Sequence, residues 1–464
     1  MSIGSVVRWI GRGLLAIVLL LVAIFAACRL RGPTQEQSAA LALMQADYRP
    51  QHGVNAFPLL WFVRSDIPAD QREARLEADV DRARRRLAAG ESFVDFKTDA
   101  PVLGEPPSND AVLCEARAAG CLAKVQASGD AIRAEIAAHP VLVSRAEDFA
   151  RTDFYWNEFP KDYRLVGVAA ANPPQRLWLS ALAVRFVDGD RAGALSGVCR
   201  NMSAWRRSQS GNNTVIGALI AQVHVDGGLR LFADMLAVLP ADVPAPPECG
   251  EALRPVVAKD VERCAQAASE YSSFMIPLQP NAAELARESW WNRATRWVFI
   301  GEQPGMHYAE LLATSCGDSA KARMLSDRAP PPPTFDPLLP PMDCVAAWIG
   351  CILGEIAATT YVDYDRRTLD FAAHLRLGAT ILWLRNGPAS GSVQARFEQR
   401  PQELRSGVRA SGTDAARGIA FVDNLDSRRE ARFELPVSPR PVAPWPARSL
   451  VTRPCAVLVS GDAC

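Results

Sequence analysis

One stretch of the chain, Asp190 to Pro240, decides the fold. It reads DRAGALSGVCRNMSAWRRSQSGNNTVIGALIAQVHVDGGLRLFADMLAVLP. Asp190 is a typical helix N-cap residue, and Asn213 can open a second helix in the same way. Each start is followed by apolar residues at helical spacing, namely Leu195, Val198, Met202 and Trp205, then Val215, Leu219, Ile220 and Val223. The Gly227-Gly228 pair interrupts the second helix and Pro240 stops it, which predicts antiparallel helix pairs with short joints.

Helical patterns continue on both sides of this stretch. No period of about 34 residues recurs, so a tandem-repeat protein is not indicated. We therefore expect a mainly α fold built as an irregular array of antiparallel helix pairs. The further expected helices are 36–48, 68–89, one from Asp130 to the residue before Pro140, a buried one over 345–359, and one that starts at Asp363 or Asp365.

The last third of the chain changes character. Residues 329–341, APPPPTFDPLLPP, predict a stiff linker or surface strap, because proline lacks an amide donor and favours extended backbone. Further on, GIAFVDN and EARFELPV flank the polar segment LDSRR and predict a small β-hairpin, with Pro436 at a sheet edge. The expected domains are an anchor (1–31), a helical domain (32–328), a linker (329–343) and C-terminal helices plus hairpin (344–464).

The apolar run Leu14–Cys28 predicts a membrane anchor. It is about 23 Å long at about 1.5 Å per residue, shorter than a hydrocarbon core of about 30 Å. Residues 6–30 suffice if Arg12 extends its guanidinium to the interface. Two alternatives stay open. The ending FAAC is similar to a bacterial lipobox with Cys28 as the acylated residue, and clean cleavage would need an A-x-A site that the run lacks.

Ten further cysteines suggest disulfide bonds and an oxidising compartment. Close spacing favours four pairs, Cys114 with Cys121, Cys249 with Cys264, Cys344 with Cys351 and Cys455 with Cys464, and leaves Cys199 and Cys316 for a long-range bond. Two cysteines seven apart on one straight helix are about 10 Å apart, too far to bond. Gly120 permits a turn in the first pair, whereas CVAAWIGC has a helical pattern throughout, which disfavours the third. No C-x-x-C occurs, which disfavours metal binding.

The sequence contains no common catalytic signature, and its five histidines form no metal motif. Three neighbouring pairs could act as ligands or in proton transfer: Asp370 with His374, His307 with Glu310, and His224 with Asp226. An ordinary structural role, such as a helix-surface hydrogen bond, is the favoured explanation of these pairs. We therefore assign no catalytic residue, no metal and no cofactor.

The aromatic segment SWWNRATRWVF, residues 289–299, has two explanations. Its tryptophans predict a helix packed in the core. Alternatively, Arg293 and Arg296 could place it at a membrane surface.

The charge balance limits the possible functions. Lys plus Arg and Asp plus Glu number 51 each, so the chain has no electrostatic signature of nucleic-acid binding. The segments GVNAFPLLW, VDGDRAGALSGVC and FADMLAVLPAD resemble those of uncharacterised membrane-anchored proteins of Gram-negative bacteria, and the resemblance implies an envelope location without an activity. We expect a single-pass inner-membrane protein with its bulk in the periplasm, and a non-enzymatic role in binding a protein partner or as a scaffold. The alternative is an envelope hydrolase whose site is assembled from distant residues, with His224, His307 or His374 as base.

Overall fold

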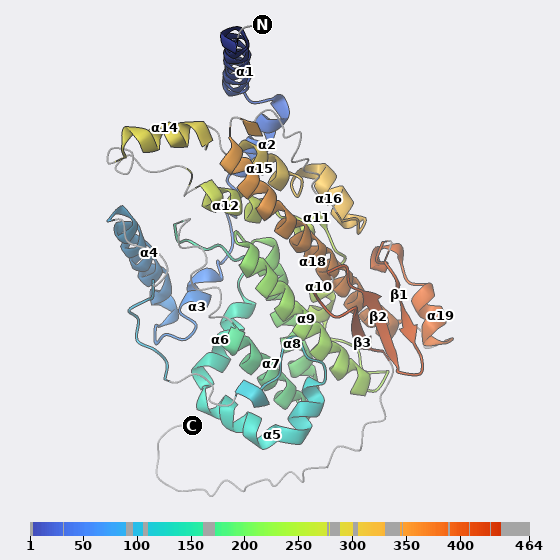
Figure 1. Cartoon of the computed structure of the whole chain (residues 1–464). Helices are drawn as coiled ribbons and strands as arrows, with labels where there is room; N and C mark the ends of the chain where they lie inside the picture. The colour runs from blue at the N-terminus through green and yellow to red at the C-terminus, as the bar shows by residue number, and fades with distance from the viewer. Residues whose placement is uncertain are drawn as a thin grey trace, which may run out of the picture.

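A computed structural model gives the fold, which is mainly α with a small antiparallel sheet (Figure 1). It describes residues 3–30, 32–89, 96–104, 110–160, 172–275, 278, 288–299, 305–329, 344–345, 347–387, 390–407, 409–426 and 428–437. The expected fold class is confirmed.

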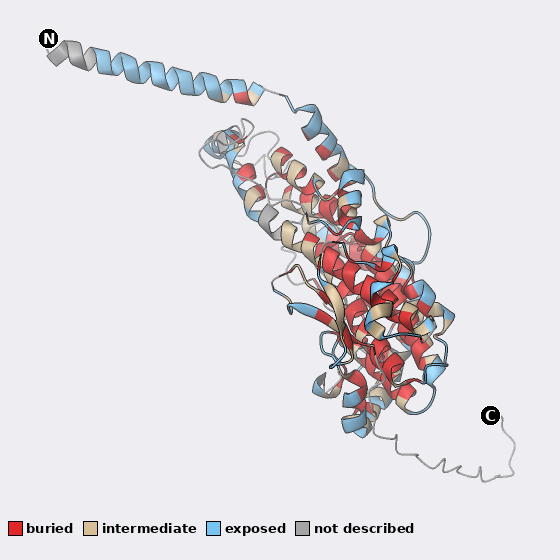
Figure 2. Ribbon diagram, turned by 90° about the vertical axis from the view of Figure 1, so that its right-hand side faces the viewer, coloured by how far each residue is buried: buried red, intermediate tan, exposed pale blue. Residues whose placement is uncertain are grey.

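The apolar N-terminal run forms α1 (Ile3–Leu30), which projects from the body and is exposed along most of its length (Figure 2). Its part Trp9–Leu30 has a mean hydropathy of 2.7, is long enough to cross a membrane, and is only 6% buried. Among the described residues, α9 (Val215–Val238) also meets this test, but it is 72% buried and therefore a core helix of the body.

The central helices follow the expected pattern. Asp190 caps α8 (Arg191–Ser210) by accepting a 3.0 Å hydrogen bond from the amide of Gly193. The N-cap of α9 is Thr214 rather than Asn213, because the Thr214 hydroxyl accepts from the amide of Gly217. Together with α7 (Asn172–Val187), these two helices pack against one another at the centre of the body (Figure 1).

The expected interruption of α9 at Gly227-Gly228 is wrong, because the helix continues through both residues. A Cβ atom on Gly227 would lie 2.6 Å from Cα of Ala116, and one on Gly228 would lie 2.3 Å from Cγ of Met202. The two glycines therefore allow close packing inside an unbroken helix.

The helices of the first half differ from expectation mainly at their ends. The expected start at Asp130 is wrong, because α5 (Cys121–Ala138) begins nine residues earlier and only kinks at Ser128. Pro140 ends that helix as expected and opens the next. The remaining helices here are α2 (Gln35–Gln45), α3 (Phe57–Trp61), α4 (Arg72–Ala88), α6 (Pro140–Ala150), α10 (Pro247–Ala252), α11 (Ala258–Val261) and α12 (Cys264–Met275).

The second half contains one long helix, α18 (Trp348–Asn386), where we expected two. Asp363 and Asp365 lie inside it and do not cap a helix start. Asp363 pairs with Arg366 and Arg428, and the buried Asp365 pairs with Arg263, so both carboxylates serve ion pairs instead. The shorter helices here are α14 (Trp290–Phe299), α15 (Met306–Ala313), α16 (Gly317–Leu325) and α19 (Val393–Glu398).

The C-terminal sheet has three strands in the order β1 (Ser411–Asp414), β2 (Ile419–Asp423), β3 (Arg432–Pro436). The expected hairpin is β2–β3, with Pro436 on an edge strand, and β1 was not anticipated. Ala420 and Val422 of β2 pair with the buried Leu435 and Phe433 and form the face that packs on the helices.

Helices before and after the Pro-rich segment share one hydrophobic core. Trp178 and Phe232 from the first block belong to the same buried cluster as Phe371 and Phe433 from the second. Residues 330–343 lie outside the described residues, so the expected linker and domain boundary remain predictions.

Three disulfides join described cysteines, Cys114–Cys121, Cys199–Cys249 and Cys344–Cys351. The pairings Cys249–Cys264 and Cys199–Cys316 are wrong, since α8 packs against α10 and brings Cys199 to Cys249. Cys344 reaches Cys351 because the backbone is not helical at Ala347, which precedes α18. Cys264 and Cys316 are buried free thiols that hydrogen bond to each other, and Cys455 and Cys464 lie outside the described residues.

Candidate functional site

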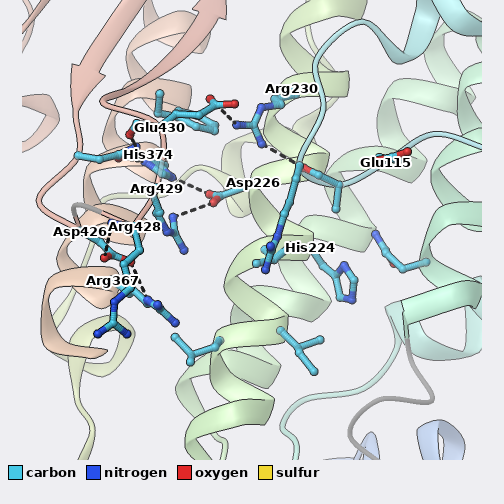
Figure 3. A pocket seen from close by; sticks show the side chains of 18 of the residues that line it. Glu115, His224, Asp226, Arg230, Arg367, His374, Asp426, Arg428, Arg429 and Glu430 are labelled. Carbon is cyan, nitrogen blue, oxygen red and sulfur yellow. Dashed lines mark hydrogen bonds and ion pairs between the residues drawn. The ribbon is translucent and has the colours of Figure 1, made fainter. Parts of the chain in front are cut away.

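An open pocket of about 760 Å³ lies between α9, α18 and the turn that joins β2 to β3 (Figure 3). The segment before α5 and the start of α7 complete its wall. These elements are far apart in the chain, and the packing of α9 against both α18 and β3 brings them together.

The pocket wall is rich in arginine. Six arginines face four carboxylates among the described lining residues, which gives the wall an excess of positive charge. The arginines are Arg117, Arg176, Arg230, Arg367, Arg428 and Arg429, and the carboxylates are Glu115, Asp226, Asp426 and Glu430.

His374 and Asp226 form the buried centre of one wall (Figure 3). Nδ1 of His374 lies 2.8 Å from Oδ1 of Asp226, and Nε2 lies 2.7 Å from Oδ1 of Asn424. The Asn424 amide nitrogen donates to the carbonyl of Glu430, so its oxygen is the atom that faces the histidine. Both imidazole nitrogens thus lie within hydrogen-bond distance of a side-chain oxygen, which fixes the orientation of the ring.

Neighbouring charges keep Asp226 ionised. Burial alone would raise its pKa, but the charge and hydrogen bond of His374, with Arg429 and Arg230 nearby, bring the pKa below the usual value. Arg429 donates to the second carboxylate oxygen at 3.2 Å, which joins the β2–β3 turn to α9. Asp226 of α9 therefore binds residues from both α18 and the β2–β3 turn, and holds these two parts of the pocket wall together.

Arg230 and Phe433 close the network on the side of the sheet. The Phe433 ring stacks on the His374 ring, with the two centroids 3.8 Å apart. The Arg230 guanidinium lies over the same Phe433 ring, 4.6 Å from its centroid. Arg230 also donates to the carbonyl of Ala116 at 3.1 Å, and this contact ties the segment before α5 to α9.

The β2–β3 turn is fixed to α18 by a second set of bonds. The Asp370 carboxylate accepts hydrogen bonds from the backbone amides of Leu425 and Asp426. It also forms an ion pair with the buried Arg409. Asp426 in turn pairs with Arg367 at 2.7 Å. The turn that carries Arg428 and Arg429 is therefore held in place before any ligand arrives.

His224 is the unusual residue of the pocket wall. It is only 3% exposed, yet both of its ring nitrogens lack a hydrogen-bond partner among the described residues. Its ring packs on Trp205 with the centroids 4.4 Å apart. Burial, and secondarily the charge of Arg117, lowers its pKa to about 3, so the ring is neutral near pH 7 and can both donate and accept.

An apolar stripe on α9 lies beside the charged wall. It consists of Ile216, Leu219, Ile220 and Val223, which line the pocket at helical spacing. Ile216 is exposed, and the other three are half-buried. Arg117, which is exposed at the other wall, has no hydrogen bond or ion pair with a described residue.

The structure separates the pairs that were adjacent in sequence. His224 packs on Trp205, whereas Asp226 binds His374 (Figure 3). Asp370 and His374 bind different partners, and their atoms share no site. His307 lies outside the pocket and bonds to Glu355 at 2.6 Å, with Glu310 more distant at 3.9 Å.

Sequence reasoning missed the arginines of the pocket and the partnership of Asp226 with His374. The only local signal was the SRR of the β2–β3 turn, which we interpreted as an ordinary polar turn. No serine, threonine, cysteine, lysine or tyrosine is among the described lining residues, so they offer no hydroxyl, thiol or amine nucleophile. Comparison of the chain with protein-family models, curated proteins and solved structures finds no match.

Proposed function

We propose that this chain is a membrane-anchored envelope protein whose body binds an anionic ligand that has an apolar segment. The role is binding and not catalysis. The observation that carries the proposal is His224, a buried side chain in the wall of an arginine-lined pocket whose two ring nitrogens bond to no residue that the structure describes. A buried polar group without a partner costs about 1–3 kcal/mol, and a ligand that bonds to it recovers this cost.

Positive charge selects the polar end of the ligand. The guanidinium of Arg117 bonds to no described residue, and arginines outnumber carboxylates among the described lining residues. Arginine binds planar or tetrahedral oxyanions through paired N–H groups, so carboxylate and phosphate fit best.

The apolar stripe accommodates the other end of the ligand. From Ile216 to Val223 it extends about 10 Å along α9 at about 1.5 Å per residue. A short hydrocarbon chain fits along this stripe, with its anionic group at Arg117 and His224.

A hydrolytic role is less well supported. Both nitrogens of His374 are engaged by Asp226 and Asn424, which leaves the imidazole no free position for a substrate proton. With no nucleophilic hydroxyl or thiol among the described lining residues, the dyad serves to position the wall.

The helix α1 and the disulfides support the proposed location of the body. An exposed apolar helix supports a single-pass anchor, and three disulfides support an oxidising compartment, which in a Gram-negative envelope is the periplasm. Alkaline phosphatase fused after Cys464 should be active in cells, and an inactive fusion beside a fluorescent cytoplasmic one would reject the topology.

Binding can be measured by calorimetry on the full-length protein in nanodiscs. The probes are octyl phosphate, inorganic phosphate and octyl glucoside, which separate the contribution of the anion from that of the chain. We expect saturable binding of octyl phosphate, weaker binding of phosphate and no saturable binding of the neutral glucoside. Saturation by the glucoside alone, or by none of the three probes, would contradict the proposal.

Variants assign the binding to the pocket. Arg117→Gln should weaken octyl phosphate binding about tenfold or more, because a hydrogen bond to a charged group contributes about 1.5–3 kcal/mol. His224→Leu should also weaken binding, while the unliganded fold keeps or gains stability because an unsatisfied polar group is removed. The matched control is Arg84→Gln, an exposed arginine of α4 paired with Asp81, which should change nothing.

A further inference from the structure

The expectation that the tryptophans of α14 lie in a core is wrong. Trp290, Trp291 and Trp297 are 74%, 63% and 50% exposed. On a helical wheel they share one face with Ala294, whereas Asn292 and Arg296 lie on the opposite face and Arg293 lies at the edge between the two. Trp290 and Trp291 contact each other, and the exposure of all three rings leaves a large apolar surface that the described residues do not cover.

Contacts with α1 fix the depth at which α14 lies. The Arg29 guanidinium donates to the Trp297 carbonyl at 2.6 Å and lies 4.5 Å from the centroid of the Trp297 ring. Phe25, one turn earlier on α1, makes an edge contact with the same ring at 5.9 Å. Arg29 marks the end of the apolar run of α1, where an anchor leaves the hydrocarbon region. Trp297 therefore lies at the level of the lipid headgroups if α1 spans the membrane.

The orientation of α14 agrees with this depth. Figure 1 shows α14 lying crosswise to α1, at the end of the body from which α1 projects. If α1 crosses the membrane, the axis of α14 therefore lies roughly parallel to the membrane plane, and one face of the helix can point toward the bilayer. Tryptophan is enriched at membrane interfaces, so the tryptophan face carries the argument. The arginines bind within the protein, because Arg296 pairs with Glu288 and Arg293 donates to the Glu288 carbonyl.

The first turns of α18 add a second exposed apolar surface at the same end. Trp348, Ile352 and Ile356 are exposed at successive turns of one helix face. This part of α18 packs on α15, where His307 bonds to Glu355, and α15 packs on α2, the helix that follows α1. The first turns of α18 are thus connected to the end of the anchor through α15 and α2.

We propose that α14 inserts its tryptophan face into the interfacial layer of the bilayer that α1 spans, with the first turns of α18 beside it. The body then contacts the membrane surface through α14 as well as through the anchor α1. This inference depends on the anchor in the proposed function. The occupant of the surface is the lipid interface, because the same tryptophan contacts the anchor at the depth of Arg29.

Lipid photolabelling tests the proposal on the full-length protein. The protein is reconstituted in vesicles of phosphatidylethanolamine and phosphatidylglycerol that contain a phospholipid with a diazirine near the start of the acyl chain. After illumination, labelled peptides are identified by mass spectrometry. We expect label in both α1 and α14.

Two variants make the result specific. Trp290→Ser, Trp291→Ser and Trp297→Ser combined should reduce the label in α14 about tenfold or more, because interfacial binding scales with the apolar area inserted. The label in α1 should not change, and circular dichroism should show an intact body because the substituted side chains are exposed. Asn292→Ser, on the polar face, is the matched control and should leave the label in α14 at its original level.

The outcomes separate this inference from the anchor. Label in α1 alone, or label in α14 that survives the triple substitution, overturns the interfacial position and leaves the anchor intact. Absence of label from both helices overturns both proposals. Crosslinks from α14 to a second copy of the chain, in place of lipid, also overturn the inference.

Discussion

At the residue scale, the protonation of His224 links the pocket to stability. Its pKa is lowered from 6.5 to about 3, first by burial and then by the charge of Arg117. Between these two values the unfolded chain takes up a proton that the folded chain does not. Its contribution to stability is therefore complete above pH 6.5 and is lost as the pH falls toward 3.

The His224→Leu variant isolates this effect. We expect the free energy of unfolding of the native chain to fall more steeply than that of the variant between about pH 6 and 4, because the variant has no group to protonate there. Urea titrations at several pH values measure the difference. Parallel pH profiles for the two proteins would show that His224 does not titrate as described.

A buried ion pair gives a second prediction at this scale. Asp260 bonds to Arg206 at 2.7 and 3.0 Å, with both side chains almost fully buried. Burial tends to raise the pKa of Asp260, but its hydrogen bonds with Arg206 lower it more. Asp260→Asn should destabilise the fold by about 3–5 kcal/mol, because it leaves a buried guanidinium without its countercharge.

The control for this prediction is an exposed pair. Asp81→Asn removes the partner of Arg84 on α4 and should cost about 0–1 kcal/mol. Chemical denaturation of both variants compares the two costs. Equal losses would mean that burial does not govern the contribution of Asp260.

At the element scale, the close packing of α9 depends on Gly227. Alanine is the better helix former by about 1 kcal/mol, so Gly227→Ala would stabilise an isolated helix. In the folded chain, the added Cβ would lie 2.6 Å from Cα of Ala116, a backbone atom that cannot turn aside. We expect a net loss of about 1–3 kcal/mol, measured by thermal or urea unfolding.

Gly250 supplies the matched substitution. It lies in α10, and a Cβ there meets nothing within 4 Å. Gly250→Ala should therefore gain up to about 1 kcal/mol. If Gly227→Ala were also stabilising, close contact with Ala116 would not be the reason for glycine in α9.

Helix boundaries show where local patterns mislead. Asp363 and Asp365 look like N-caps in sequence, because Asp at a helix start is common. In the structure their carboxylates pair with arginines from other segments, and α18 continues past them. A capping residue and an ion-pairing residue have the same local signature.

At the scale of the whole molecule, the disulfides make unequal contributions. Cys199–Cys249 closes a separation of 50 residues and Cys114–Cys121 one of 7. Loop-closure entropy then predicts about 4 kcal/mol for the first bond and about 2 kcal/mol for the second. Paired alanine substitutions, compared by urea unfolding, should give losses in this order, and the reverse order would contradict the entropic account.

Part of the fold could be predicted from sequence. The helical periodicity after Asp190 and the alternation in β2 and β3 are local, so the central helices and the hairpin were found. Strand β1, with the sequence SGTD, has no apolar alternation and was missed. The tryptophans of α14 were assigned to a core, because sequence gives the amphipathic face but not what covers it.

The sequence by itself determined the exposed apolar helix α1, the helical class and the small sheet, because each follows from the spacing of neighbouring side chains. Only the tertiary structure decided which cysteines bond and where the pocket lies. Asp226 meets His374 across 148 residues and Arg429 across 203, and no local pattern encodes contacts at such separations. They depend on how α9, α18 and the sheet pack, and this packing arises from the burial of the whole core.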